Sequence, residues 1–163
     1  MYQLGHYGAA LLAYAPLGTI VALGGHETVA IVGAVSCLAL STLPDCDQQL
    51  PAIEHRGPTH SVVFALLVGV GLASITALFI DGSSPAAETG VAAFAFVVGT
   101  LSISSHLLAD LLTPMGIRPF WPFSTRHYTL EITNAANPLA NYALFGAGIS
   151  AVLVSVAIVA TVG

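Results

Sequence analysis

The fold of this chain is decided by the stretch SVVFALLVGVGLASITALFI, which runs from Ser61 to Ile80 without a charged side chain. About 20 apolar residues in an α-helix span the roughly 30 Å hydrocarbon core of a bilayer. Across all 163 residues, 56% are hydrophobic and only 7% are charged, and mean hydropathy is +0.88. Soluble domains carry roughly 25% charged residues. The composition therefore excludes a soluble globule, a disordered tail and a basic nucleic-acid-binding module, and it indicates an integral membrane protein.

Four further apolar windows flank this stretch. The five expected transmembrane helices are Tyr7–Leu23, Thr28–Leu43, Ser61–Ile80, Gly90–Leu112 and Pro138–Val162. The second window is near the lower length limit for a span. Small residues recur within the windows at spacings that allow close packing of membrane helices. We expect a single domain, an all-α polytopic bundle of about five transmembrane helices.

The loops between these windows are unequal: residues 44–60 and 113–137 are long, and residues 24–27 and 81–89 are short. Five crossings place the N-terminus and both long loops on one side of the membrane. The chain has no lysine, and its three arginines all fall in the long loops. The positive-inside rule makes that side the cytoplasm. We expect a multi-pass protein of the cell (inner) membrane whose polar loops face the cytoplasm.

Histidines and aspartates gather on that same side. His106 and Asp110 are four residues apart, so on a helix they share one face inside an apolar window. Ionisable residues there cost about 2.5 kcal/mol or more unless they are paired, hydrated or metal-bound. Asp45 and Asp47 are close enough to repel one another unless a cation or a proton lies between them. The other candidates at this end are His6, His55, Arg56 and His60.

These residue types indicate a metal site, because imidazole with carboxylate suits zinc, manganese or iron better than calcium. The expected ligands are His6, Asp45, Asp47, His60, His106 and Asp110. A divalent ion would activate water for hydrolysis. Asp47 or Asp45 would then serve as the general base, Arg56 would stabilise the oxyanion, and His55 would be a neighbour in the catalytic site. A simpler interpretation makes Asp45 a turn residue and the loop histidines solvated.

Three strings strengthen the catalytic interpretation: LPDCD (Leu43–Asp47), HRGPTHS (His55–Ser61) and SHLLADLLTPMGIRPFWP (Ser105–Pro122). With His6 ahead of the first window, they resemble the YdjM-type family of membrane-bound metal-dependent hydrolases. The resemblance covers about residues 1–122, and the fifth window adds little to it. The chain departs from the family at Gln48, where members often have a histidine after the second aspartate.

The resemblance implies a function. The family is similar at long range to the all-helical zinc-dependent phospholipase C and nuclease clan. This implies phosphoester hydrolysis with zinc or manganese, one to three ions, held by the six ligands named above, with His55 and Arg56 beside them. Because the site lies at the membrane, we expect a phospholipid, an isoprenoid phosphate or another lipid-linked ester as substrate. The small-residue faces permit a homodimer, and no nucleic-acid partner is expected.

Two other functions remain open. Intramembrane histidine and aspartate also build proton relays and metal pathways in transporters. A transporter should place its polar residues near the midplane and show repeats, whereas these residues gather at one end. A membrane scaffold with a structural metal needs only four ligands, and this chain offers seven or eight candidates. We therefore expect a hydrolase.

Overall fold

The computed structural model describes residues 1–49, 56–80, 82 and 84–163. Its elements are α1 (Gln3–Leu23), α2 (Glu27–Leu40), the 3-10 helices η1 (Leu43–Gln49) and η2 (Pro58–His60), α3 (Val62–Phe79), α4 (Pro85–Leu111) and α5 (Pro138–Val162). Five helical segments are long and apolar enough to cross a membrane, with α2 and η1 counted together as one. The described residues contain no strand. The predicted all-α membrane bundle is confirmed.

Three helix ends differ from those expected from hydropathy. α1 begins four residues earlier, which brings His6 inside the helix. α4 begins five residues earlier, because the Ser84 hydroxyl accepts a hydrogen bond from the backbone N–H of Ala87 at 3.2 Å and Pro85 takes the first helical position. α2 ends three residues earlier, and the chain continues through Pro44 as η1. The Ser84 cap, rather than the limit of the apolar window, sets the start of α4.

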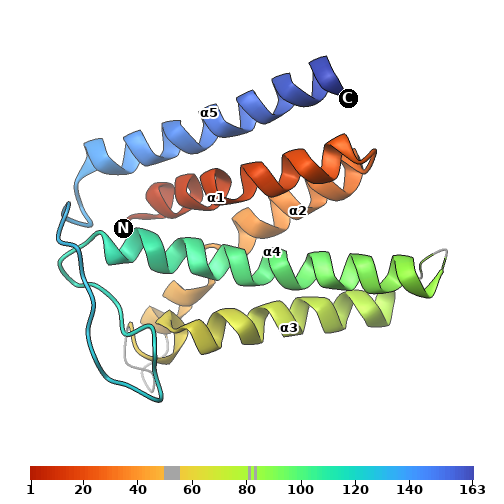
Figure 1. The fold of residues 1–163 in the computed structure, drawn as a ribbon. Coiled ribbons are helices and arrows are strands. Elements are labelled where there is room, and N and C mark those ends of the chain that lie inside the picture. Colours follow the sequence, from red (N-terminus) through yellow and green to blue (C-terminus); the bar gives the residue numbers. More distant parts are fainter. Residues whose placement is uncertain (50–55, 81, 83) are drawn as a thin grey trace.

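The helices pack through α1 and α4. α1 lies along α5 and also contacts α2 and α4, while α3 lies along α4 (Figure 1). Glycines mark both of the long contacts. A Cβ atom on Gly99 would lie 3.0 Å from Cα of Gly69, and one on Gly148 would lie 2.5 Å from the carbonyl oxygen of Gly8. A larger residue would push these helices apart, which is how small residues act in membrane bundles.

The bundle is apolar outside and polar inside at one end. Leu78 and Phe79 of α3 are 78% and 80% exposed, as suits side chains that face lipid. Polar side chains are buried where α1 and α3 begin and α2 and α4 end. The buried polar residues at this end include His6, Ser41, Asp47, His60, Ser61, His106, Asp110 and Thr113. Such burial in a membrane protein demands partners, and it locates the candidate site.

The segment between α4 and α5 closes the polar end. Ile117 and Tyr128 exchange two backbone hydrogen bonds of 2.9 Å, which fold the segment back on itself. The backbone N–H of Val62, at the start of α3, donates to the carbonyl of Pro119 at 2.9 Å. The segment thereby joins the ends of α3 and α4 that carry the polar side chains.

Candidate metal centre

Four side chains from three parts of the chain converge at the polar end. Asp45 lies on η1, His60 ends η2, and His106 and Asp110 lie one turn apart on α4. Each offers one ligand atom, and these four atoms all lie within 4.8 Å of one another. His60, His106 and Asp110 are fully buried, whereas the side chain of Asp45 is 28% exposed. We call these four residues the ligand cluster.

The separations inside the ligand cluster are short and even. Nε2 of His60 lies 3.1 Å from Nε2 of His106. Oδ2 of Asp110 lies 3.5 Å from each of these nitrogens, and Oδ1 of Asp45 lies 3.7 Å from each. Within the described ranges, Oδ2 of Asp110 has no hydrogen-bond partner although it is buried. A buried carboxylate oxygen without a donor needs a cation nearby.

The contacts on the other ring nitrogens show how both imidazoles are oriented. Nδ1 of His106 lies 2.7 Å from the carbonyl oxygen of Ser41, which can only accept, so Nδ1 is the donor. Nδ1 of His60 lies 3.0 Å from the Thr59 hydroxyl and 3.3 Å from Oδ2 of Asp47. A neutral ring that donates from Nδ1 carries its lone pair on Nε2. Two lone pairs then face one another at 3.1 Å, an arrangement that a metal ion or a proton between them would stabilise.

Asp47 lies behind His60 rather than among the converging atoms. Its Oδ2 accepts hydrogen bonds from the Thr59 hydroxyl at 2.6 Å and from the backbone N–H of Arg56 at 3.1 Å, and it lies beside Nδ1 of His60. The sequence-based interpretation placed Asp47 among the metal ligands. Its position here is that of the carboxylate that orients a metal-ligating histidine.

Burial and charge act in opposite directions on His60. Burial lowers the pKa of its imidazole, but the nearby carboxylates of Asp110, Asp45 and Asp47 favour the charged form. Together the carboxylates outweigh burial and raise the pKa of His60 above its ordinary value. A ring that attracts a proton so readily also attracts a metal ion.

Arg56 connects the two sides of the site. It adopts a positive φ of 61°, and its NH2 group donates to Oδ1 of Asp110 at 2.9 Å. Its NH1 group donates to the hydroxyl of Thr113 and to the carbonyl of Gly116, both at 3.1 Å. Its Nε is buried and has no hydrogen-bond partner in the described part of the chain. Arg56 thus fixes the carboxylate of Asp110 and keeps one N–H group available.

His6 lies against the ligand cluster but does not belong to it. Its ring stacks on that of His106, with centroids 3.7 Å apart and planes 8° apart. Its Nε2 lies 3.0 Å from the carbonyl oxygen of Met1, 3.6 Å from Oδ1 of Asp110 and 3.9 Å from Oδ2 of Asp45. The amino group of Met1 also contacts Oδ1 of Asp110. His6, predicted as a ligand, therefore faces the carboxylate oxygens that point away from the cluster.

Three supporting residues were missed by sequence reasoning: Ser41, Thr59 and Thr113. A fourth, Asn141, belongs to a face of asparagines that the sequence suggested for contact between helices, with a site role as the alternative. The first three support His106, His60 and Arg56 through the contacts given above. Asn141 of α5 is buried, and its Oδ1 accepts from the backbone N–H of Tyr2 at 2.9 Å, close to His6. An asparagine in an apolar window was a signal for such a role. His55, predicted as a site neighbour, lies outside the described residues.

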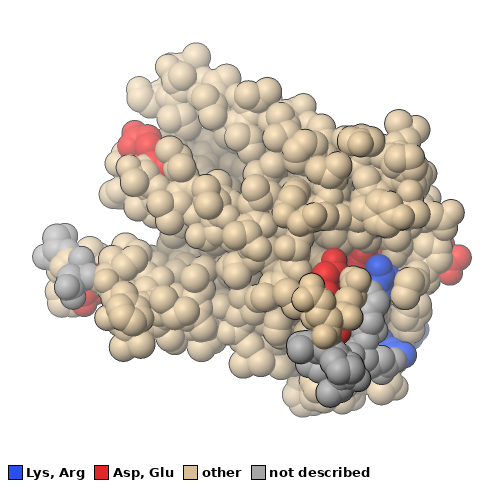
Figure 2. Space-filling view, turned by 180° about the vertical axis from the view of Figure 1, so that it is seen from behind, with Lys and Arg blue, Asp and Glu red and all other residues tan. Residues whose placement is uncertain are grey.

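The ligand cluster reaches the surface on one face of the molecule. Asp45 is its exposed member, and the side chain of Arg56 is 10% exposed. On the face drawn in Figure 2, acidic and arginine atoms lie side by side at one end, and most of the remaining surface is uncharged. The partial exposure of Asp45 is therefore the point at which the ligand cluster meets the surface.

The chain matches the YdjM inner membrane protein family over residues 1–163. The match includes α5 and so extends beyond residue 122, where the sequence motifs end. Searches of curated proteins and of solved structures returned no significant match. A family match over the whole length agrees with the five apolar helices. The chain belongs to the YdjM inner membrane protein family.

Proposed function

We propose that this protein is a membrane-embedded, metal-dependent hydrolase that cleaves a phosphoester or another ester in a lipid or lipid-linked substrate. The observation that carries the proposal is the pair of Nε2 atoms of His60 and His106, which face one another at 3.1 Å while both Nδ1 atoms contact acceptors. Carboxylate oxygens of Asp45 and Asp110 complete the group. This donor set suits a divalent transition metal.

The spacing of the four atoms supports zinc, with manganese as the alternative. A regular tetrahedron with metal–ligand bonds of about 2.1 Å has edges of about 3.4 Å. Five of the six separations within the ligand cluster run from 3.1 to 3.7 Å, and the sixth, between Asp45 and Asp110, is at most 4.8 Å. One ion would therefore fit among the four donors with little movement of their side chains.

Unequal burial divides the ligands into two kinds. His60, His106 and Asp110 are fully buried and would hold the ion, whereas Asp45 is partly exposed and sits on a short 3-10 helix. Catalytic zinc sites keep three protein ligands and one exchangeable position. Asp45 would leave that position to substrate or water, and its free carboxylate would then act as the general base.

The reaction would be the addition of water across the ester bond. A bound divalent ion would lower the pKa of a water molecule and polarise the phosphoryl or carbonyl oxygen. Asp45 would take the proton, and the water oxygen would form the new bond to phosphorus or carbon. As the ester bond breaks, the protonated Asp45 would return this proton to the leaving oxygen. The unpaired Nε–H of Arg56 would donate to the developing oxyanion.

A lipid-linked substrate suits the position of the site. The ligand cluster lies at the ends of the membrane-spanning helices α2 and α4, beside apolar surfaces that suit contact with lipid. The positive-inside rule supports a cytoplasmic orientation for this end, because all three arginines belong to the loops there. An amphiphile can present its head group at this depth without leaving the bilayer.

One observation favours a second candidate, a structural metal site. Four protein donors converge, and a closed set of four is typical of structural zinc. A structural ion would be held as firmly by Asp45 as by the buried ligands, and the protein would unfold when the ion is removed. A catalytic ion would exchange through the exposed side of Asp45 while the bundle stays folded.

The test combines metal content with turnover. Protein purified without a histidine tag or chelator should carry about one equivalent of zinc or manganese and release phosphate from phosphatidic acid or an isoprenoid phosphate in vesicles. His60→Ala should lose both properties. His127→Ala is the matched control, because His127 is exposed and contacts the carbonyl of Met115 instead. Metal-free protein that takes up no added zinc, or equal turnover in both variants, would refute the proposal.

A further inference from the structure

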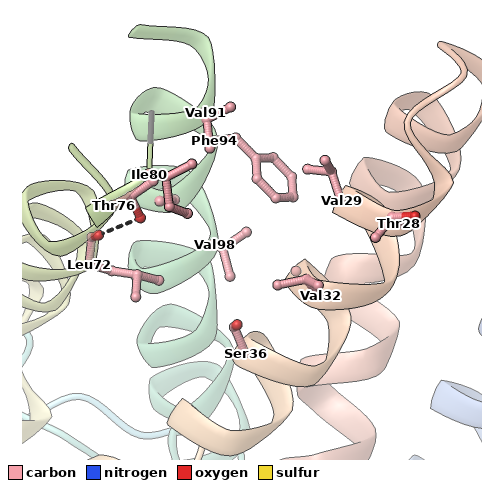
Figure 3. Close-up of a pocket in the computed structure, with 12 residues that line it drawn as sticks. Thr28, Val29, Val32, Ser36, Leu72, Thr76, Ile80, Val91, Phe94 and Val98 are labelled. Atoms are coloured by element: carbon pink, nitrogen blue, oxygen red, sulfur yellow. Dashed lines mark hydrogen bonds between the residues drawn. The ribbon is translucent and has the colours of Figure 1, made fainter. Parts of the chain in front are cut away.

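An apolar cavity of about 280 Å³ lies between α2, α3 and α4 in the half of the bundle away from the ligand cluster (Figure 3). Val32 and Ser36 line it from α2, Leu72 and Thr76 from α3, and Phe94 and Val98 from α4. The Thr76 hydroxyl donates to the carbonyl of Leu72 at 2.8 Å within its own helix. This hydroxyl is therefore satisfied, and the cavity suits a hydrocarbon. We call this cavity the chain slot.

The chain slot exists because α2 and α3 both pack on α4 and barely touch one another in the part of the chain that is described. Its floor is α4, and its open side faces the surrounding lipid. Val32 is 58% exposed. At this depth of a membrane, the material that fills such a gap is hydrocarbon.

The chain slot and the ligand cluster share α4, and the 3-10 helices that carry Asp45 and His60 adjoin α2 and α3, which line the slot. Ser36 precedes Ser41, which contacts His106, by five residues, or about 7.5 Å along α2. Val98 precedes His106 by eight residues, or about 12 Å along α4. Near the ligand cluster, the half-buried apolar side chains of Leu43 and Phe64 pack against the buried group that includes Ile103 and Leu107. Figure 2 shows a hollow in the surface on the same face of the molecule as the charged patch.

We propose that the chain slot holds the hydrocarbon chain of the substrate whose head group lies at the ligand cluster. The inference rests on the proposed function, since it takes the metal centre as the place of the head group. A chain that leaves the centre between α2 and α3 would pass over Leu43 and enter the slot about 10 Å away. The substrate would therefore be a long-chain amphiphile, and short-chain esters would not reach the slot.

The experiment uses a long-chain alkyl phosphate that carries a diazirine near the end of its chain, incorporated with the protein in lipid nanodiscs. A neutral alkyl glycerol with the same diazirine chain reports on bulk lipid. After irradiation, the labelled peptides are identified by mass spectrometry. Val32→Trp fills the slot. Val35→Trp is the matched control, because Val35 is an equally apolar residue of α2, 63% exposed, that does not line the slot.

We expect the alkyl phosphate to label the slot faces of α2, α3 and α4 in the wild type and in Val35→Trp, and Val32→Trp to lose this labelling while it keeps its zinc. Even labelling over all lipid-facing helices, or slot labelling by the neutral probe alone, would overturn the inference. Slot labelling that persists unchanged in zinc-free protein would show bulk lipid rather than substrate. Failure to bind zinc at all would instead refute the metal centre, so the two failures are distinguishable.

Discussion

Oδ2 of Asp47 lies 3.3 Å from Nδ1 of His60, on the opposite side of the imidazole ring from the nitrogen that faces His106. The Thr59 hydroxyl and the backbone N–H of Arg56 hold the carboxylate in that position. A carboxylate at this place fixes the ring orientation and increases the basicity of Nε2. Asp47 would therefore tune the affinity of His60 for a metal ion without being a ligand itself.

Asp47→Asn should weaken metal binding without abolishing it. The amide keeps the shape of the side chain but loses the charge that favours donation from Nδ1 of His60, and loss of such a partner costs about 10–100-fold in affinity. Zinc titration against a fluorescent chelator measures the change. Asp110→Asn, which alters a residue of the ligand cluster, should cause a much larger loss. Equal effects of the two substitutions would place Asp47 among the ligands.

Asp45→Asn should separate metal binding from turnover. The three buried donors remain, so the protein should still bind about one equivalent of zinc, while the exchangeable carboxylate and its basicity are gone. Loss of a general base lowers turnover by about 10²–10⁴-fold. Phosphate release from vesicles measures the rate. Gln48→Ala is the control, because Gln48 only donates to Asp45 from the surface. An Asp45→Asn protein with wild-type turnover would exclude Asp45 as the base.

Arg56→Met should destabilise the metal-free protein more than the zinc-bound protein. The guanidinium is mostly buried and pairs with Asp110, so its removal leaves this buried carboxylate with the amino group of Met1 in place of two cationic partners, which costs up to about 3–5 kcal/mol. A zinc ion on the same carboxylate restores positive charge and should recover part of this loss. Thermal unfolding in detergent, with and without zinc, measures the loss of stability in the zinc-bound and the metal-free protein. Equal destabilisation in the two states would mean that Arg56 acts only through packing.

Most of the fold could be predicted from hydropathy, because long charge-free windows in a chain with 7% charged residues leave few alternatives. The helix ends could not, since they depend on local capping. Glu88 interrupts the apolar pattern of α4 although the helix already begins at Pro85 behind the Ser84 cap. The packing of α2 and α3 on α4 could also not be predicted from the sequence, because contacts between membrane helices depend on the shapes of their surfaces rather than on hydropathy.

The site could be predicted as a set but not as a geometry. Chain parity and the spacing of His106 and Asp110 placed the polar residues at one end, where they do lie. Asp45 and Asp47 are only two residues apart, so the sequence could not assign one to the cluster and the other to His60. The 3-10 form of η1 and the hydrogen bonds from Thr59 and Arg56 make that distinction. These contacts join residues 9 and 12 positions apart, which neither helical nor strand spacing brings together.

Zinc affinity should fall as the pH is lowered from about 8 to about 5.5, because a protonated His60 cannot ligate. The carboxylates raise the pKa of His60, so protons compete with zinc at a higher pH than for an unperturbed histidine. The stability of the metal-free protein should change with pH in the opposite direction. Because the pKa of His60 is higher in the folded than in the unfolded protein, protonation of His60 stabilises the fold. This stabilisation is fully present below the unfolded pKa and is lost as the pH rises through the folded pKa. Zinc titrations and metal-free unfolding curves over this pH range should therefore show opposite trends. Parallel trends would mean that His60 is not the group for which zinc and protons compete.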